Sequence, residues 1–208
     1  ALPEGTVTVL FTDVEGSTDL TTRRGDEAAR AALRAHEELV RQQVQEHGGR
    51  EVKAIGDGFM VAFGSARKAV ACAVAIQRAL EEWNAGVGAH GRAPLPEPLR
   101  VRIGLNTGEV VREQDDLFGE TVNAAARIAA KAKGGQVLIS EATKGVLGRA
   151  QDVELVDRGR FRLKGFPERW HLFEVVWQEE LPAAGASIVI ERTPFVGREA
   201  ARAELRRL

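Results

Sequence analysis

The chain has 208 residues, with 29 Lys and Arg against 30 Asp and Glu, so its formal net charge is -1. This balance argues against a nucleic-acid-binding or anionic-membrane surface, since both require a basic excess. A single cysteine cannot form an internal disulfide, and the longest apolar run, residues 69–76, is far shorter than the roughly 20 residues of a membrane-spanning helix. These features predict a cytoplasmic, soluble protein with neither nucleic acid nor membrane among its partners.

The first half of the chain predicts a strand, a helix, a hairpin and a second helix. Alternating apolar residues indicate a strand over 6–12. A helical stretch follows Gly16-Ser17-Thr18 and ends at 47–49, with an interruption at Gly25 and Asp26 as N-cap of its second segment. Its apolar spacing predicts one buried stripe: Ala32, Leu33, His36, Leu39, Val40 and Val44. Strands at 51–55 and 59–63 flank Gly56-Asp57-Gly58, which is typical of a tight antiparallel hairpin. Ser65 is expected to cap a helix that ends near residue 84.

A Gly/Pro-rich loop over 86–98 separates this half from the second. The elements expected next are a strand at 99–106, a hairpin that begins at 109–112 and turns at 113–116, and a helix at 119–133. A strand at 136–139, a short helix at 140–147 capped at Ser140, and strands at 152–163 and 170–176 follow. The order is β-α-β-β-α-β followed by β-α-β-β. Its first six elements match the split βαβ, ferredoxin-like plan. We therefore predict an α+β fold with a ferredoxin-like βαββαβ core, in which helices cover one face of an antiparallel sheet, and a C-terminal β-α-β-β extension.

Two carboxylates stand out by position. Asp13 ends the first strand and Asp57 lies at the hairpin tip, so adjacent strands would bring both to one end of the sheet. Carboxylate oxygens suit Mg²⁺ or Mn²⁺, and paired ions suit phosphoryl chemistry. Taken singly, each aspartate also fits an ordinary turn.

Between them, the turn Gly16-Ser17-Thr18 leads from a strand into a helix. Its free N–H groups suit a polyphosphate, although plain helix capping by Ser17 or Thr18 needs no ligand.

Two further pairs of polar residues complete the candidate set. Asn123 and Arg127 are four residues apart and project from one helix face, where they suit a sugar and a phosphoryl group or form a solvated surface. Lys53 and Asp116 can donate to adenine N1 and accept from its amino group, whereas guanine presents the reverse pattern. Ordinary surface charge is the alternative for this second pair.

Three segments carry a family resemblance. Leu10–Thr18 (LFTDVEGST) resembles the first metal motif of class III adenylyl and guanylyl cyclases, and Lys53–Gly58 (KAIGDG) resembles their second. Asp116–Arg127 (DLFGETVNAAAR) resembles their third motif, which carries the second purine-binding residue and a transition-state pair. The resemblance extends over residues 6–176, and the three motifs occur in the family's order.

The resemblance implies an adenylyl cyclase of bacterial type. Asp13 and Asp57, with Val14 among the metal-binding positions, would hold two divalent cations, Mg²⁺ or Mn²⁺. Lys53 and Asp116 would select adenine, Asn123 would orient the ribose, and Arg127 would stabilise the pentavalent phosphorus. The 3′-hydroxyl of ATP would attack the α-phosphate and expel pyrophosphate. Apart from Val14, these six side chains are all of the types expected in an adenylyl cyclase.

The family resemblance also implies a head-to-tail homodimer with two shared sites, because one chain carries both half-sites. Two alternatives are weighed beside it. One is an ATP-sensing module with little turnover that controls an attached ATPase or transcriptional domain, and the other is a cyclase that acts on GTP.

The domain division and the histidines remain. Residues 1–177 are expected to form the catalytic domain, and residues 178–208 a linker followed by the phrase Thr193–Glu199, which resembles the opening of P-loop regulatory ATPase modules. A C-terminal helix that folds back on the domain is the alternative for this tail. The four histidines, His36 among them, lack the spacing of a zinc site.

Overall fold

The computed structural model describes residues 2–17, 25–86, 98–148 and 153–178. The strands are β1 (Thr6–Val14), β2 (Arg50–Ile55), β3 (Gly58–Phe63), β4 (Val101–Glu109), β5 (Val111–Glu113), β6 (Asp116–Phe118), β7 (Val137–Ser140), β8 (Leu155–Arg162) and β9 (Arg169–Val175). The helices are α2 (Asp26–Glu46), α3 (Ala66–Asn84), α4 (Glu120–Ala129) and α5 (Glu141–Leu147). Seven strands form one sheet in the order β2-β3-β1-β4-β7-β9-β8, and β5 and β6 form a separate hairpin.

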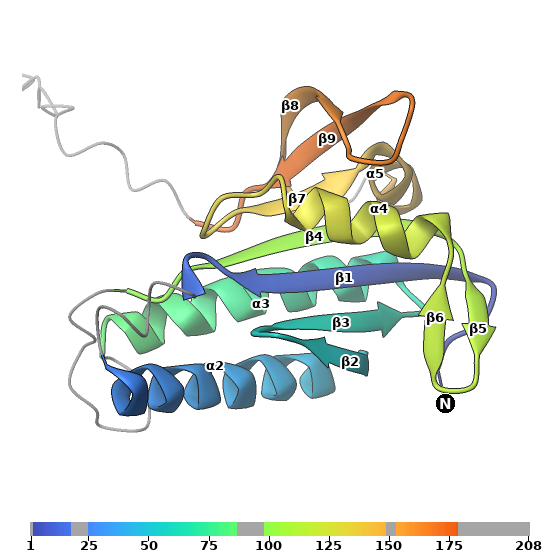
Figure 1. Cartoon of the computed structure of the whole chain (residues 1–208). Helices are drawn as coiled ribbons and strands as arrows, with labels where there is room; N and C mark the ends of the chain where they lie inside the picture. The colour runs from blue at the N-terminus through green and yellow to red at the C-terminus, as the bar shows by residue number, and fades with distance from the viewer. Residues whose placement is uncertain (1, 18–24, 87–97, 149–152, 179–208) are drawn as a thin grey trace, which may run out of the picture. The chain divides into compact units, whose positions relative to one another are not determined.

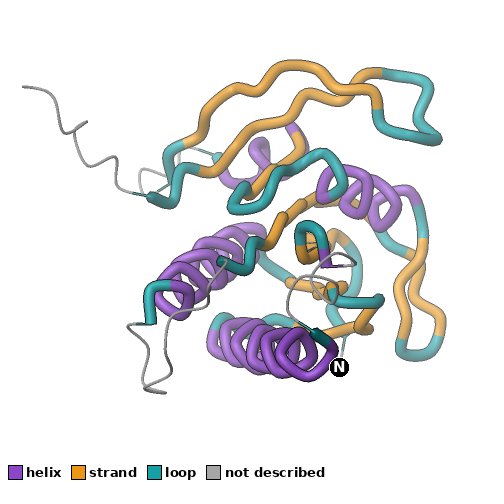
Figure 2. The backbone as a smooth tube through the Cα atoms, turned by 60° about the vertical axis from the view of Figure 1, so that its left-hand side comes forward, coloured by secondary structure: helices purple, strands orange, loops and turns teal. Residues whose placement is uncertain are grey.

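The alternation of side chains along β1 separates two cores on opposite faces of the sheet. Leu10 and Val14 pack into the core formed with α2 and α3, whereas Val7 and Val9 pack into the core formed with α4. Figure 1 shows α2 and α3 on one side of β1 and α4 on the other, and Figure 2 shows α2 and α3 lying next to each other. The α+β fold is therefore confirmed, with both helices of the βαββαβ core on one face and α4 of the extension on the opposite face.

The sheet is antiparallel except at one pair of strands. β1 pairs antiparallel with β3 on one side and with β4 on the other, which makes it central, while β4 and β7 run parallel. The parallel pair arises because α4 connects β4 to β7 as a crossover. The central position of β1 beside β3 is the arrangement on which the predicted meeting of Asp13 and Asp57 depends.

Backbone contact holds α4 closely against the sheet at Gly104 of β4. A Cβ added to Gly104 would lie 2.1 Å from the Ala129 nitrogen. At the other end of the helix, a Cβ added to Gly108 would lie 2.6 Å from Thr121 Oγ1. Only glycine permits this approach, so both ends of α4 are positioned by the strand beneath it.

Several local predictions are confirmed and three are wrong. Ser65 and Ser140 cap α3 and α5 by accepting hydrogen bonds from the backbone. Asp26, however, is the first residue of α2, and Gly25 at φ 75° occupies the N-cap without a side-chain hydrogen bond. Glu109 belongs to β4 rather than to the following hairpin.

The third error concerns the end of α4, which stops at Ala129 instead of Lys133. The chain turns there because the Gly135 nitrogen donates to the Val101 carbonyl, at 2.9 Å, where β7 begins beside β4. No helix in the described part of the chain is long and apolar enough to cross a membrane. The predicted loop over 86–98 lies almost wholly outside the described residues, as do the predicted linker and ATPase-like segment from residue 179 onward.

Candidate active site

The β2–β3 turn lies directly against the end of β1 that carries Asp13. A Cβ added to Gly58 would lie 2.1 Å from the Thr12 carbonyl oxygen and 3.3 Å from the Asp13 Cα. The Thr12 hydroxyl also accepts a hydrogen bond from the Phe59 nitrogen at 2.9 Å. Glycine at position 58 therefore lets the turn that carries Asp57 approach Asp13, as the adjacency of β1 and β3 predicts.

The Asp13 carboxylate is held by a basic residue from the neighbouring strand. Arg102 of β4 faces Asp13 across the ladder, and its guanidinium donates to Asp13 Oδ2 from both Nε and Nη2. Both side chains are 34% exposed. The guanidinium thus occupies Oδ2, one of the two carboxylate oxygens that could bind a cation.

Asp57 differs, because its carboxylate has a buried oxygen without a partner. Oδ2 makes no hydrogen bond to any described residue. The nearby imidazole of His36, on α2, is likewise without a hydrogen-bond partner at either ring nitrogen within the described chain. Burial lowers the pKa of His36 to about 4, although the carboxylates of Asp57 and Glu37 act to raise it.

The oxygens at this end of the sheet fit a hard divalent cation. An unpartnered buried carboxylate oxygen costs about 1–3 kcal/mol, which a bound cation or a hydrogen-bond donor would recover. No group of three or more His, Cys, Asp and Glu side chains with metal-binding geometry occurs in the described ranges. Asp13 and Asp57 would therefore need ligands of another kind, such as a backbone carbonyl from Val14, water and substrate phosphates.

The turn after β1 is anchored at its start. The Glu15 nitrogen donates to the Arg100 carbonyl at 2.8 Å, and Glu15 Oε1 accepts from the Gly134 nitrogen at 3.0 Å. Gly16 adopts φ 67°, a left-handed conformation that favours glycine. Ser17 and Asp57 both line a pocket of about 320 Å³ between this turn, α2 and the β2–β3 turn. Thr18 lies outside the described residues.

Lys53 and Asp116, which are 63 residues apart, form an ion pair. Lys53 Nζ donates to Asp116 Oδ2 at 2.5 Å, and the Leu117 nitrogen donates to Oδ1 at 2.8 Å. The Lys53 hydrogen bond and the smaller effect of the Leu117 N–H lower the pKa of Asp116, while partial burial opposes them. The Lys53 ammonium also lies 5.5 Å from the centre of the Phe118 ring. The structure thus brings together a donor and an acceptor at the place where β2 meets the β5–β6 hairpin.

Asn123 and Arg127 are exposed on α4. Neither side chain makes a hydrogen bond or ion pair with a residue that the structure describes. Lys53 lies on the same side of the sheet as α4, because it pairs with Met60, whose side chain is in the α4-side core. The α4 side of one chain therefore presents the base-binding and the transition-state candidates together, open to solvent.

Sequence reasoning assigned no role to Arg102 and placed His36 only within the buried stripe of a helix. A signal for His36 was present, since a polar residue lies in the middle of a stripe whose other buried members are apolar. Nothing local marks Arg102, because its proximity to Asp13 depends on the pairing of β1 with β4.

Comparison with known protein families and relatives agrees with the motifs. The model of the adenylate and guanylate cyclase catalytic domain matches residues 1–176. An uncharacterized protein of Mycobacterium tuberculosis is 41% identical over 170 residues, which cover 79% of this chain and 54% of that protein. The chain thus spans about half the length of this relative.

Solved structures of both substrate classes share the fold. Adenylate cyclases of Trypanosoma brucei, solved in their monomeric state, superpose with a TM-score of 0.70 at 28% identity, covering 82% of this chain and 89% of theirs. The guanylyl cyclase Cya2 superposes with a TM-score of 0.71 at 28% identity, covering 87% and 98%. The fold alone therefore does not distinguish ATP from GTP.

Proposed function

Since this chain belongs to the family of adenylate and guanylate cyclase catalytic domains, we propose that it is an adenylyl cyclase. It would convert ATP to 3′,5′-cyclic AMP and pyrophosphate, with two divalent cations, at sites shared between two copies of the chain. The observation that carries this proposal is the Lys53–Asp116 pair, whose 2.5 Å contact joins a cationic donor to an anionic acceptor.

The pair supports ATP as the substrate. The edge of adenine presents an acceptor at N1 beside a donor at the exocyclic amino group. Lys53 would donate to N1, and Asp116 would accept from the amino group. Guanine presents the reverse arrangement, with a donor at N1–H and an acceptor at O6. The Lys53 ammonium would then face another donor, and the Asp116 carboxylate would face another acceptor.

Asp13, Asp57 and the Val14 carbonyl would hold the cations. When bound, these ions lower the pKa of the ribose 3′-hydroxyl and neutralise charge on the leaving pyrophosphate. Arg102 takes Oδ2 of Asp13, so a cation that used this oxygen would have to displace the guanidinium. No described residue forms an ion pair with the Asp57 carboxylate, so a cation there requires no such exchange.

The remaining candidates position the nucleotide. The backbone N–H groups of Gly16-Ser17-Thr18 would hold the triphosphate, Asn123 would orient the ribose, and Arg127 would donate to the α-phosphoryl oxygens in the transition state. The 3′-oxygen forms a bond to the α-phosphorus as the bond to the β-phosphate bridging oxygen breaks, and the hydroxyl proton passes to solvent. No covalent intermediate with the protein is required, so positioning and charge neutralisation supply the catalysis.

Two features support a shared site. Asn123 and Arg127 are exposed and make no contact with a polar partner among the described residues. Exposed apolar side chains, Ile55, Val111 and Phe118, are 49%, 55% and 42% exposed and come from β2, β5 and β6, the elements of the Lys53–Asp116 pair. A second copy that covers these residues would bring its own Asp13 and Asp57 to the nucleotide.

The first test is an assay of the purified chain with ATP or GTP, in Mn²⁺ and in Mg²⁺. We expect cyclic AMP, little cyclic GMP, and a specific activity that rises with protein concentration. Bound ATP without cyclic AMP in a confirmed dimer would instead favour an ATP-sensing module.

A double variant tests the base assignment directly. Lys53→Glu with Asp116→Ser removes the adenine pattern and supplies an acceptor for guanine N1–H. We expect kcat/KM for ATP to fall by about 10- to 100-fold while that for GTP rises. An unchanged ATP preference would refute the assignment of Lys53 and Asp116.

Complementation tests the shared site. Asp57→Asn removes a cation ligand from one half of each shared site, and Arg127→Ala removes the transition-state donor from the other half. Each homodimer therefore carries the same defect in both of its sites and should be inactive. Mixed in equal amounts, half of the dimers would be heterodimers with one intact site, which restores about a quarter of wild-type activity. If each chain held a complete site of its own, mixing would restore nothing.

A further inference from the structure

The helix α2 buries one residue that its neighbours do not explain. Its buried stripe consists of Ala29, Ala32, His36, Val40 and Val44, so the imidazole stands among small apolar side chains. His36 is 1% exposed, and neither ring nitrogen has a hydrogen-bond partner in the described chain. A buried polar group left unpaired costs about 1–3 kcal/mol, so this arrangement suggests a partner in another state of the site.

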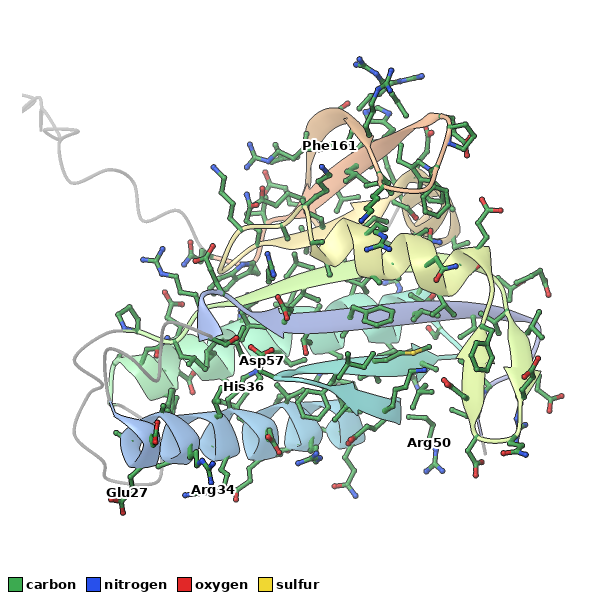
Figure 3. All side chains as sticks on the ribbon, in the orientation of Figure 1. Glu27, Arg34, His36, Arg50, Asp57 and Phe161 are labelled. Atoms are coloured by element: carbon green, nitrogen blue, oxygen red, sulfur yellow. The ribbon has the colours of Figure 1, made fainter. Side chains whose placement is uncertain are left out.

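The candidate acceptor is Asp57. Figure 3 shows His36 projecting from α2 toward Asp57, whereas Glu27 and Arg34 project from the opposite side of the helix. The Asp57 carboxylate is the largest electrostatic influence of another residue on His36. Its Oδ2 is itself buried and has no hydrogen-bond partner in the described ranges. One hydrogen bond would therefore satisfy an orphaned donor and an orphaned acceptor together.

The imidazole is held in place by the same strand that carries the Asp57 turn. Phe59 of β3, two residues after Asp57, is 2% exposed, and its ring centre lies 6.3 Å from that of His36. The Arg41 guanidinium lies over the Phe59 ring, 5.0 Å from its centre. Because Phe59 packs against both α2 residues, the imidazole and the β2–β3 turn belong to one packed unit.

We propose that His36 is a positioning residue that donates an N–H hydrogen bond to Asp57 Oδ2 when the other carboxylate oxygen binds a divalent cation. This inference rests on the metal-binding role of Asp57 in the proposed function. An imidazole carries at least one N–H in every protonation state, so no proton transfer is involved. A carboxylate with one oxygen on a cation and the other on a fixed donor has a single orientation, and such supporting hydrogen bonds tune metal affinity.

The test compares His36→Leu, which removes the donor but keeps an apolar side chain, with His36→Gln, which retains an N–H. Mn²⁺ binding is measured on the full chain by the electron paramagnetic resonance signal of free Mn²⁺, with and without a non-hydrolysable ATP analogue. We expect His36→Leu to weaken Mn²⁺ binding by about 10- to 100-fold and His36→Gln to restore part of it. Thermal unfolding in EDTA should show the metal-free His36→Leu protein at least as stable as wild type, since an unpaired buried polar group is gone.

Val40→Ala is the matched control, because Val40 is buried in the same stripe and carries no donor. It should lower the unfolding temperature and leave Mn²⁺ binding unchanged. A second readout is the imidazole N–H resonance of His36, which should become protected from exchange when Mg²⁺ is added.

Three results would overturn the inference. The first is that His36→Leu binds Mn²⁺ as tightly as the wild-type protein. The second is that His36→Leu and Val40→Ala lose stability and Mn²⁺ affinity in parallel. The third is that Asp57→Asn leaves the Mn²⁺ affinity unchanged. If His36→Leu fails to fold, the His36 N–H resonance of the wild-type protein, followed with and without Mg²⁺, decides. No added protection from exchange on Mg²⁺ addition would then overturn the inference.

These outcomes separate the inference from the proposed function. Mn²⁺ binding that depends on His36 without any cyclic nucleotide would reject the cyclase activity and keep the positioning role. Cyclic AMP formation together with Mn²⁺ binding that does not depend on His36 would support the cyclase activity and reject the positioning role.

Discussion

Lys53 and Asp116 neutralise each other at 2.5 Å and remain about a third exposed. By contrast, a buried oxygen of Asp57 and the nearby His36 imidazole have no hydrogen-bond partner among the described residues. The first pair is satisfied without a ligand, and an exposed ion pair of this kind is worth only about 0–1 kcal/mol, so a ligand can replace it at small cost. The second pair is unsatisfied and gains from binding. The proposed base-binding pair can therefore exchange partners at small cost, while Asp57 and His36 would each gain from a new partner.

The largest expected effect comes from Asp57→Asn. Loss of the carboxylate charge removes a cation ligand, so cyclic nucleotide formation should fall by on the order of 10³-fold, measured as product per unit time at saturating Mn²⁺. Asp116→Asn, the equivalent change in the base-binding region, should cost less and act mainly on KM for ATP. Equal losses in both variants would remove the distinction between the two regions.

Gly104→Ala tests how the sheet supports the α4 side. The new Cβ would lie 2.1 Å from the Ala129 nitrogen, so α4 must shift. We expect the free energy of unfolding to fall by about 3 kcal/mol, measured by urea titration, with activity lost because Asn123 and Arg127 move with the helix. Gly145→Ala in α5 is the control, since nothing lies within 4 Å of its added Cβ. It should raise the free energy of unfolding by about 0.5–1 kcal/mol.

Arg102→Met tests whether the guanidinium on Asp13, which has no counterpart at Asp57 among the described residues, weakens cation binding. Without the guanidinium, Asp13 Oδ2 is free, so Mn²⁺ should bind the nucleotide-free protein about 3- to 10-fold more tightly, as measured by calorimetry. Arg112→Met is the control, because Arg112 pairs with Glu4 at 3.0 Å, away from Asp13. Unchanged or weaker Mn²⁺ binding in Arg102→Met would show that the guanidinium does not compete with the cation.

The smallest effect concerns the titration of Asp116. The Lys53 hydrogen bond is the main cause of its lowered pKa, so Lys53→Met should raise that pKa toward the ordinary aspartate value, as followed by carboxyl carbon NMR. The stability that the pair contributes is present above the ordinary pKa and is lost as pH falls through the lowered one. Lys53→Met should flatten this pH dependence. If the pKa of Asp116 did not move, the Leu117 N–H rather than Lys53 would be its cause.

The sequence alone predicted most elements of the fold, because their signals are local. Alternation along β1, the Gly56-Asp57 turn and the caps Ser65 and Ser140 each act within a few residues. The errors arose where distant contacts prevailed. α4 ends early because Gly135 must reach Val101, and Gly25 rather than Asp26 occupies the N-cap of α2.

The amino-acid sequence by itself determined which side chains are available: two aspartates for cations, a lysine and an aspartate for a base, and an Asn/Arg pair on one helix face. The tertiary structure alone decided which of them meet. Strand order brings Arg102 to Asp13 and the Asp57 turn to the end of β1, and packing of α2 on β3 places His36 beside Asp57. The physical reason is that side-chain type and helical or strand periodicity are written along the chain, whereas hydrogen-bond partners across a sheet depend on how distant segments pair.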